Sequence, residues 1–175
     1  MSESESTPEA ASTEPLETSE GAPEASEPGT AQLLAQADTS TVFRVMNLES
    51  VVFDLGDPSP QVHLMESEMP FRHISVSIAL PEAQALYAAL HDITGRRPST
   101  HELASAILRQ LQADVIAVRV VRHEAGVFYA ELDVMTPRGR ELFDCRTSDG
   151  FILAMRQAVP APILCAEEVI QSFYV

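Results

Sequence analysis

The stretch that decides the fold is Glu141–Arg156, ELFDCRTSDGFILAMR. In its first part apolar and polar residues alternate as in a strand, and in its last part apolar residues recur at helical spacing. Between these parts lies a polar segment that includes Asp144, Arg146 and Asp149. A strand-to-helix junction of this kind places ionisable groups beside free backbone N–H groups, which favour anions. The junction is therefore a candidate functional site.

Outside this junction, the sequence pattern predicts alternating blocks of strands and helices. We expect strands at 42–55, 61–66, 71–79, 115–122, 127–136, 140–146 and 163–166, helices at 81–94, 99–111 and 148–159, and a helical turn at 167–171. Tight turns join most neighbouring strands, which indicates antiparallel pairing with the helices segregated from it. The predicted fold class is α+β: a mostly antiparallel or mixed sheet with three main helices packed on it.

The apolar spacing also predicts which faces are buried. In the helix at 99–111, the stripe comprises Leu103, Ile107, Leu108 and Leu111. In the strand at 127–136, we expect Asp133 on the polar face and Phe128 on the buried one. Thr147 or Ser148 is expected to cap the helix that follows the junction.

The N-terminal segment differs from the rest in composition. Residues 1–40 contain nine of the 26 acidic residues and none of the 11 basic ones. Large apolar side chains are almost absent there, so we predict a disordered acidic tail at 1–41 and a folded domain at 42–175. The domain itself is mildly acidic, which argues against a broad electrostatic surface for nucleic acid but allows a local arginine cluster. Every basic residue is Arg.

The cysteines and the hydropathy bear on the cellular compartment. Cys145 and Cys165 belong to no CxxC or Cys/His set, so we predict neither zinc nor a disulfide framework. No secretory signal pattern and no apolar run of about 20 residues is visible. We therefore expect a cytoplasmic protein without a membrane segment, and a homo-oligomer is left open.

Three predicted helices begin with polar residues. They are Glu82, the run Thr100–Glu102, and the run Thr147–Asp149. If these starts meet in space, they offer carboxylates for a divalent metal, His101 for proton transfer and Arg146 for a phosphate.

Each of these residues also has a purely structural interpretation. Glu82 and Asp149 are first-turn acids that suit a helix dipole, and Glu102 has capping-box spacing to Ser99. Asp144 and Arg146 can form a simple exposed ion pair on one strand.

Four segments, in this order and spacing, resemble the bifunctional nuclease domain. They are Ile74–Leu86 (ISVSIALPEAQAL), Arg97–Leu103 (RPSTHEL), Gly126–Leu132 (GVFYAEL) and Phe143–Ala154 (FDCRTSDGFILA). The resemblance spans about residues 43–170. It implies an α+β domain and, for some members, cleavage of DNA and RNA. Departures from the family pattern include Thr147 in place of a proline and Gly150 in place of an alanine.

Two functional hypotheses follow from these residues and the resemblance taken together. The first is a nuclease that hydrolyses phosphodiester bonds of DNA and RNA with little sequence preference. Its catalytic residues are expected to be Glu82, His101, Glu102, Asp144 and Asp149, its substrate contacts Arg97, Arg146 and Ser148, and its ligands for Mg²⁺ or Mn²⁺ Glu82, Asp144 and Asp149. The second is a regulatory module that uses the same polar face to bind an anionic ligand or a partner protein without catalysis.

Overall fold

The computed structural model describes residues 41–54, 56 and 59–174. Apart from Thr41, the predicted acidic tail lies outside these residues. The described chain forms seven strands and four helices. In chain order they are β1 Phe43–Val52, β2 Gln61–Glu66, β3 His73–Ser77, α1 Leu80–Leu90, α2 Thr100–Gln110, β4 Asp114–Glu124, β5 Val127–Thr136, β6 Gly139–Arg146, α3 Thr147–Met155, β7 Ile163–Ala166 and α4 Glu167–Gln171.

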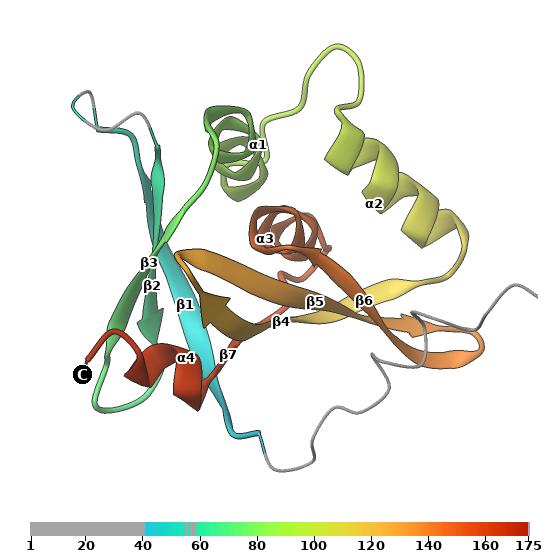
Figure 1. The fold of residues 1–175 in the computed structure, drawn as a ribbon. Helices are drawn as coiled ribbons and strands as arrows, with labels where there is room; N and C mark the ends of the chain where they lie inside the picture. The colour runs from blue at the N-terminus through green and yellow to red at the C-terminus, as the bar shows by residue number, and fades with distance from the viewer. Residues whose placement is uncertain (1–40, 55, 57–58, 175) are drawn as a thin grey trace, which may run out of the picture. The chain divides into compact units, whose positions relative to one another are not determined.

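All seven strands belong to one sheet in the order β3-β2-β1-β7-β4-β5-β6 (Figure 1). Two antiparallel meanders, β1–β3 and β4–β6, form its two sides. The late strand β7 lies between them, antiparallel to β1 and parallel to β4. The mixed α+β fold is therefore confirmed, and β4 is an inner strand as expected.

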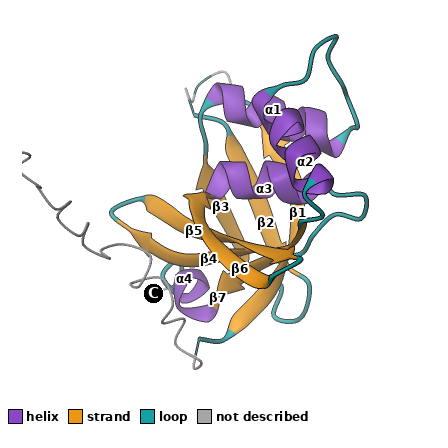
Figure 2. Cartoon of the chain, turned by 90° about the vertical axis from the view of Figure 1, so that its right-hand side faces the viewer, coloured by secondary structure: helices purple, strands orange, loops and turns teal. Residues whose placement is uncertain are grey.

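Helix α3 is the central helix of the packing. Figures 1 and 2 show α1, α2 and α3 on one side of β4–β6, with α3 between the sheet and the other two helices. Phe151 and Ile152 of α3 are fully buried, and α1 contributes Ala83, Leu86 and Ala89 to the same core. The short helix α4 packs beside β4 and β7.

Two predictions of burial are wrong. Leu103, Ile107 and Leu111 of α2 are each about half exposed or more, because α2 meets α3 through the face that carries the buried Ser105. Asp133 is 1% exposed rather than solvated. It is paired with Arg140 on the neighbouring strand β6, and this ion pair permits its burial.

The start of α3 also differs from the expectation. Its N-cap residue is Arg146, with extended backbone angles and no side-chain cap. Thr147 and Ser148 lie within the first turn and are buried. The Thr147 hydroxyl donates to the backbone oxygen of Phe128 (3.1 Å), so it ties α3 to the β4–β5 hairpin instead of capping the helix.

Gly150 allows α3 to approach the sheet closely. A Cβ atom at this position would lie 2.9 Å from Val118 Cγ1 and 3.3 Å from Cys145 Sγ. Val118 is fully buried, so its methyl group has little room to move. The glycine that departs from the family pattern is thus required by packing in this chain.

None of the four helices in the described ranges combines the length and the hydropathy of a bilayer-spanning segment.

We expect Gly150→Ala to lower the free energy of unfolding by about 1–2 kcal/mol. The gain in helix propensity, about 1 kcal/mol, is outweighed by overpacking against Val118. Urea denaturation measures the change. The double variant Val118→Ala/Gly150→Ala should lose less stability than the two single changes added together, because the smaller side chain makes room for the new methyl group. An alanine at position 150 that stabilises the protein would contradict the packing argument.

Candidate functional site

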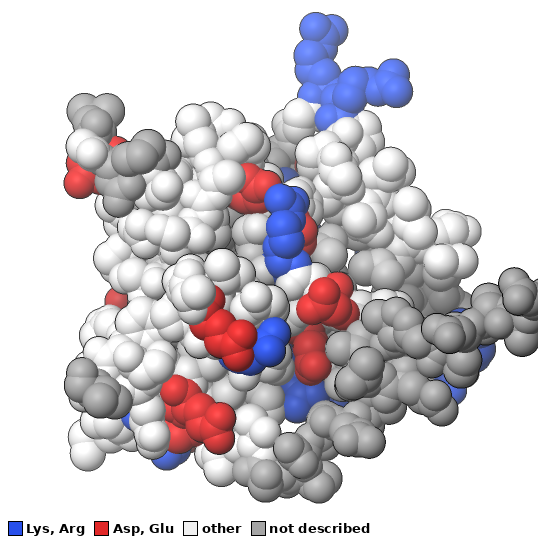
Figure 3. Space-filling view, in the orientation of Figure 1, with Lys and Arg blue, Asp and Glu red and all other residues white. Residues whose placement is uncertain are grey.

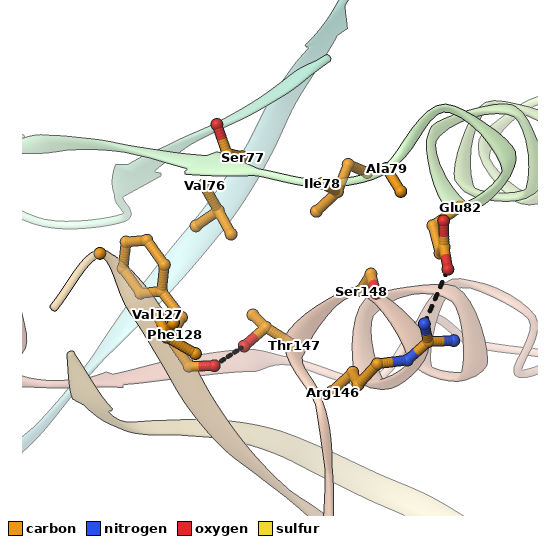
Figure 4. A pocket seen from close by; sticks show the side chains of 11 residues that line it. Val76, Ser77, Ile78, Ala79, Glu82, Val127, Phe128, Arg146, Thr147 and Ser148 are labelled. Carbon is orange, nitrogen blue, oxygen red and sulfur yellow. Dashed lines mark hydrogen bonds and ion pairs between the residues drawn. The ribbon is translucent and has the colours of Figure 1, made fainter. Parts of the chain in front are cut away.

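A hollow of about 290 Å³ lies at the start of α3 (Figure 4). Its walls come from the segment that joins β3 to α1, from the β4–β5 hairpin and from the strand-to-helix junction. We call it the Arg146 hollow, and it is lined by Val76, Ser77, Ile78, Ala79, Glu82, Gly126, Val127, Phe128, Arg146, Thr147 and Ser148.

Arg146 joins the starts of two helices. Its Nη1 donates to Glu82 Oε1 of α1 at 2.8 Å (Figure 4). Its Nε and Nη2 donate to the two carboxylate oxygens of Asp149 at 2.7 and 3.0 Å, a bidentate arrangement. The Arg146 side chain is 66% exposed, whereas that of Glu82 is 14% exposed. The guanidinium group is therefore accessible while it holds two acidic groups in place.

His101 connects the start of α2 to this arrangement. Its Nε2 lies 2.9 Å from Asp149 Oδ1, so Asp149 contacts both Arg146 and His101. Residues from α1, α2 and α3 thus form one connected cluster: Glu82, Arg146, Asp149 and His101. His101 and Asp149 do not line the Arg146 hollow themselves but connect to its edge through Arg146.

The charge on Asp149 is stabilised by this cluster. Burial alone would raise the pKa of its carboxyl group, but hydrogen bonds from Arg146 and His101 outweigh burial and hold that pKa below 3.8. A carboxyl group with a lowered pKa stabilises the fold above its unfolded pKa, and this contribution is lost as the pH falls through the folded pKa. At neutral pH Asp149 is therefore ionised and remains paired with Arg146.

Two polar side-chain groups that line the hollow form no hydrogen bond with the described residues: a carboxylate oxygen and a hydroxyl group. Glu82 Oε2 is buried and accepts no hydrogen bond. The Ser148 hydroxyl group lines the hollow beside the first turn of α3 and makes no side-chain hydrogen bond. Each group can therefore form a further hydrogen bond.

Three of the predicted site residues lie apart from this cluster. Glu102 completes a capping box with Ser99, and its Oε1 lies 3.3 Å from Arg156 Nη1. Arg97 lies in the exposed loop between α1 and α2.

Asp144 is on the opposite side of the sheet from α3. Its neighbour Cys145 directs its Sγ atom toward Gly150 of α3, and successive strand residues point to opposite faces. Asp144 is instead directly opposite Glu131 of β5. This placement follows from the twofold period of β6, whereas Arg146 reaches α1 because the strand ends there.

The predicted metal ligands do not form a group. Among the described residues, no set of three or more His, Cys, Asp and Glu side chains is arranged to hold a metal ion. Glu82 and Asp149 are bridged by the cation of Arg146, and Asp144 is on the other face of the sheet. The set Glu82, Asp144 and Asp149 therefore does not fit one ion in this arrangement. A requirement for Mg²⁺ or Mn²⁺ stays a prediction.

Cys145 packs toward the core, as expected. Burial, followed by the charges of Asp149 and Asp144, raises the pKa of its thiol group to about 11. The thiolate needed for nucleophilic attack is therefore scarce at neutral pH.

The sequence reasoning missed the apolar wall of the hollow. Val76, Ile78 and Phe128 form this wall, and they were interpreted only as strand residues. The signal was present in the segments Ile74–Leu86 and Gly126–Leu132, which carry the family resemblance and contain all three.

A further feature is the surface charge. On the face shown in Figure 3, acidic and basic side chains are interspersed among the described residues, without a broad basic patch.

The fold and the cluster define an α+β domain in which three helix starts are joined through Asp149 and the accessible Arg146. A family model described as the bifunctional nuclease domain matches residues 62–175, and the chain belongs to this family. The match begins at β2, whereas the resemblance seen in the sequence began at about Phe43. A comparison with curated proteins finds no match.

We expect Arg146→Gln to lower the free energy of unfolding by about 1–2 kcal/mol. The change leaves the carboxylates of Glu82 and Asp149 close together without their cation. The double variant Glu82→Gln/Arg146→Gln should lose less stability than the two single changes added together, since fewer unpaired charges remain. Thermal unfolding at neutral pH gives all three values. The exposed Arg138, replaced by Gln, is the matched control and should change stability by less than about 0.5 kcal/mol. Strictly additive single changes would show that Arg146 and Glu82 are not coupled.

Proposed function

We propose that the protein is a nuclease that hydrolyses phosphodiester bonds of DNA and RNA with little sequence preference. The reaction takes place at the Arg146 hollow. The observation that carries the proposal is the cluster in which Arg146 connects Glu82, Asp149 and His101 at the edge of that hollow. Membership of the bifunctional nuclease domain family supports the same reaction.

Phosphate binding uses three groups of the junction. The exposed guanidinium of Arg146, the hydroxyl group of Ser148 and the free backbone N–H groups at the start of α3 offer hydrogen-bond donors to phosphate oxygens. All of them contact the phosphate rather than the edge of a base. Contacts of this kind carry no sequence information, which accounts for the weak sequence preference.

Proton transfer is assigned to His101. Because Asp149 accepts a hydrogen bond from Nε2, the neutral imidazole carries its proton there, and Nδ1 is the nitrogen that can accept another. His101 takes a proton from the attacking water, whose oxygen forms the new bond to phosphorus. The bond to the leaving oxygen breaks, and that oxygen takes a proton from solvent. Glu82 and Asp149 position Arg146 and His101.

His101→Ala is expected to reduce the rate of cleavage of single-stranded DNA and of RNA by about 10²-fold or more, the usual contribution of a general base. Arg146→Lys should also reduce cleavage, because a lysine cannot reproduce the bidentate contact with Asp149. Initial rates on end-labelled oligonucleotides measure both effects.

His91→Ala is the matched histidine control, because His91 lies at the end of α1 and stacks on Tyr87 outside the cluster. It should cleave at the wild-type rate. Full activity of a folded His101→Ala protein would remove His101 from the reaction.

The role of a divalent ion is tested separately, and no step above depends on it. The sequence prediction is that cleavage is lost in a chelator and restored by Mg²⁺ or Mn²⁺. Rates are measured on protein dialysed against the chelator, with and without added metal. Unchanged cleavage in the chelator would contradict the metal prediction and leave the assignment of the side chains in place.

The second candidate function is a regulatory module that binds an anionic ligand or a partner protein at the same hollow. It is favoured by one observation: three of the five N–H donors of Arg146 are already engaged by two carboxylates, as in a structural ion pair. A rise in the unfolding temperature with nucleotides, together with no cleavage of DNA or RNA, would support it over the nuclease.

A further inference from the structure

A second hollow, of about 420 Å³, lies between α2, the loop that joins α1 to α2, and the end of α3. Asp92 and Gly95 of the loop, Glu102, Ser105 and Arg109 of α2, and Arg156 at the end of α3 are among its lining residues. We call it the Arg156 hollow. It shares no lining residue with the Arg146 hollow.

Two donors in the wall of this hollow have no partner in the described structure. The hydroxyl group of Ser105, a residue that is only 3% exposed, is buried without a hydrogen bond. The Nε of Arg156 is also buried without an acceptor, and the Arg156 side chain is 12% exposed. Buried polar groups are almost always paired, so two unpaired donors in one hollow indicate a missing acceptor.

The arginines around this hollow are concentrated compared with the rest of the acidic chain. Arg109 and Arg156 line it, and Arg96 and Arg97 belong to the loop that forms one wall. These are four of the 11 basic residues in a chain with a net charge of −15.

Two carboxylates also line the hollow, Asp92 and Glu102. The charge of Glu102 is already engaged, because its carboxylate accepts from the backbone N–H of Ser99 at 2.7 Å and pairs with Arg156. Hydrogen bonds with Ser99 lower the pKa of Glu102, which keeps it ionised in this role. Among the lining residues, Arg109 is then balanced by Asp92. The excess positive charge beside the hollow comes from Arg96 and Arg97 in the exposed loop.

We propose that the Arg156 hollow binds the phosphate group of a nucleotide. A hydroxyl group and two guanidinium groups on different elements suit the several oxygens of a phosphate better than the two coplanar oxygens of a carboxylate. The volume suits a whole nucleotide unit rather than a lone ion. The inference goes beyond the nuclease proposal, because binding here requires no cleavage.

The nucleotide has two possible sources with the same chemistry. It is either a free mononucleotide or one unit of a nucleic-acid strand that also enters the Arg146 hollow. Asp149 and Arg156 are seven residues apart on and just after α3, a rise of roughly 10 Å along the helix axis. One nucleic-acid strand can therefore reach both hollows.

The test is equilibrium binding, measured by calorimetric titration of the full chain at constant ionic strength. The probes are inorganic phosphate, a 5′-mononucleotide, a short single-stranded oligonucleotide, and acetate as a carboxylate control. Each titration is repeated with Arg146→Gln, which separates binding at the Arg146 hollow from binding at the Arg156 hollow.

We expect Arg109→Gln and Ser105→Ala each to weaken phosphate-ester binding by about tenfold. Ser105→Ala should fold normally, because it removes a buried hydroxyl group that has no partner. Arg138→Gln, at an exposed hairpin, should bind as the wild type does. Binding of the mononucleotide identifies a free nucleotide as the ligand, and binding of the oligonucleotide alone identifies a strand.

Three outcomes would overturn the proposal. They are no binding of any phosphate probe in the Arg146→Gln protein, equal affinity for acetate and phosphate, and equal losses in Arg109→Gln and Arg138→Gln. Loss of binding in Ser105→Ala without any cleavage by the wild type would leave this site standing while the nuclease proposal fails.

Discussion

The contact between Gly150 and Val118 is the constraint on which the site depends. Without a Cβ at Gly150, the first turn of α3 lies directly against β4. Strand β6 ends immediately before this turn, and Arg146 is both its last residue and the N-cap of α3. Arg146 then contacts Glu82 of α1 and Asp149 of α3. Asp149 in turn contacts His101 of α2, so three helix starts become one cluster. A packing requirement inside the core thus determines an electrostatic arrangement at the surface.

The cluster is held by a single cation shared between two acidic groups. Arg146 contacts Glu82 and Asp149, and only Arg146 is largely exposed. The hydrogen bonds to these two carboxylates use three of the five N–H donors of the guanidinium group, which leaves one on each Nη atom. The domain is acidic overall, so the positive charge of Arg146 is a local feature and not part of a broad basic surface. This agrees with a surface on which charges of both signs are interspersed (Figure 3).

Local patterns predicted the elements well, and long-range packing explains the rest. Strands β2, β5 and β7 have the predicted bounds, because the alternation of apolar and polar residues and the turn residues are local signals. The place of β7 between the two meanders was not predictable, since pairing across more than a hundred residues leaves no local trace. The predicted capping box at Ser99 is present, whereas Arg146 displaced both hydroxyl residues from the N-cap of α3. Asp144 shows the same limit: its spacing to Arg146 was visible, but the end of the strand, which separates the two side chains, depends on the packing of α3.

The position of β7 has a consequence for how the domain is made. Each meander can pair its own strands from a short, continuous piece of chain. The two meanders do not pair with each other among the described strands; each pairs with β7, the last strand of the sheet in sequence. During synthesis, therefore, neither β1 nor β4 can pair with β7 until Ile163–Ala166 has left the ribosome. Closing the sheet requires β1 to pair with a segment more than a hundred residues later in the chain, and long-range pairing of this kind slows folding.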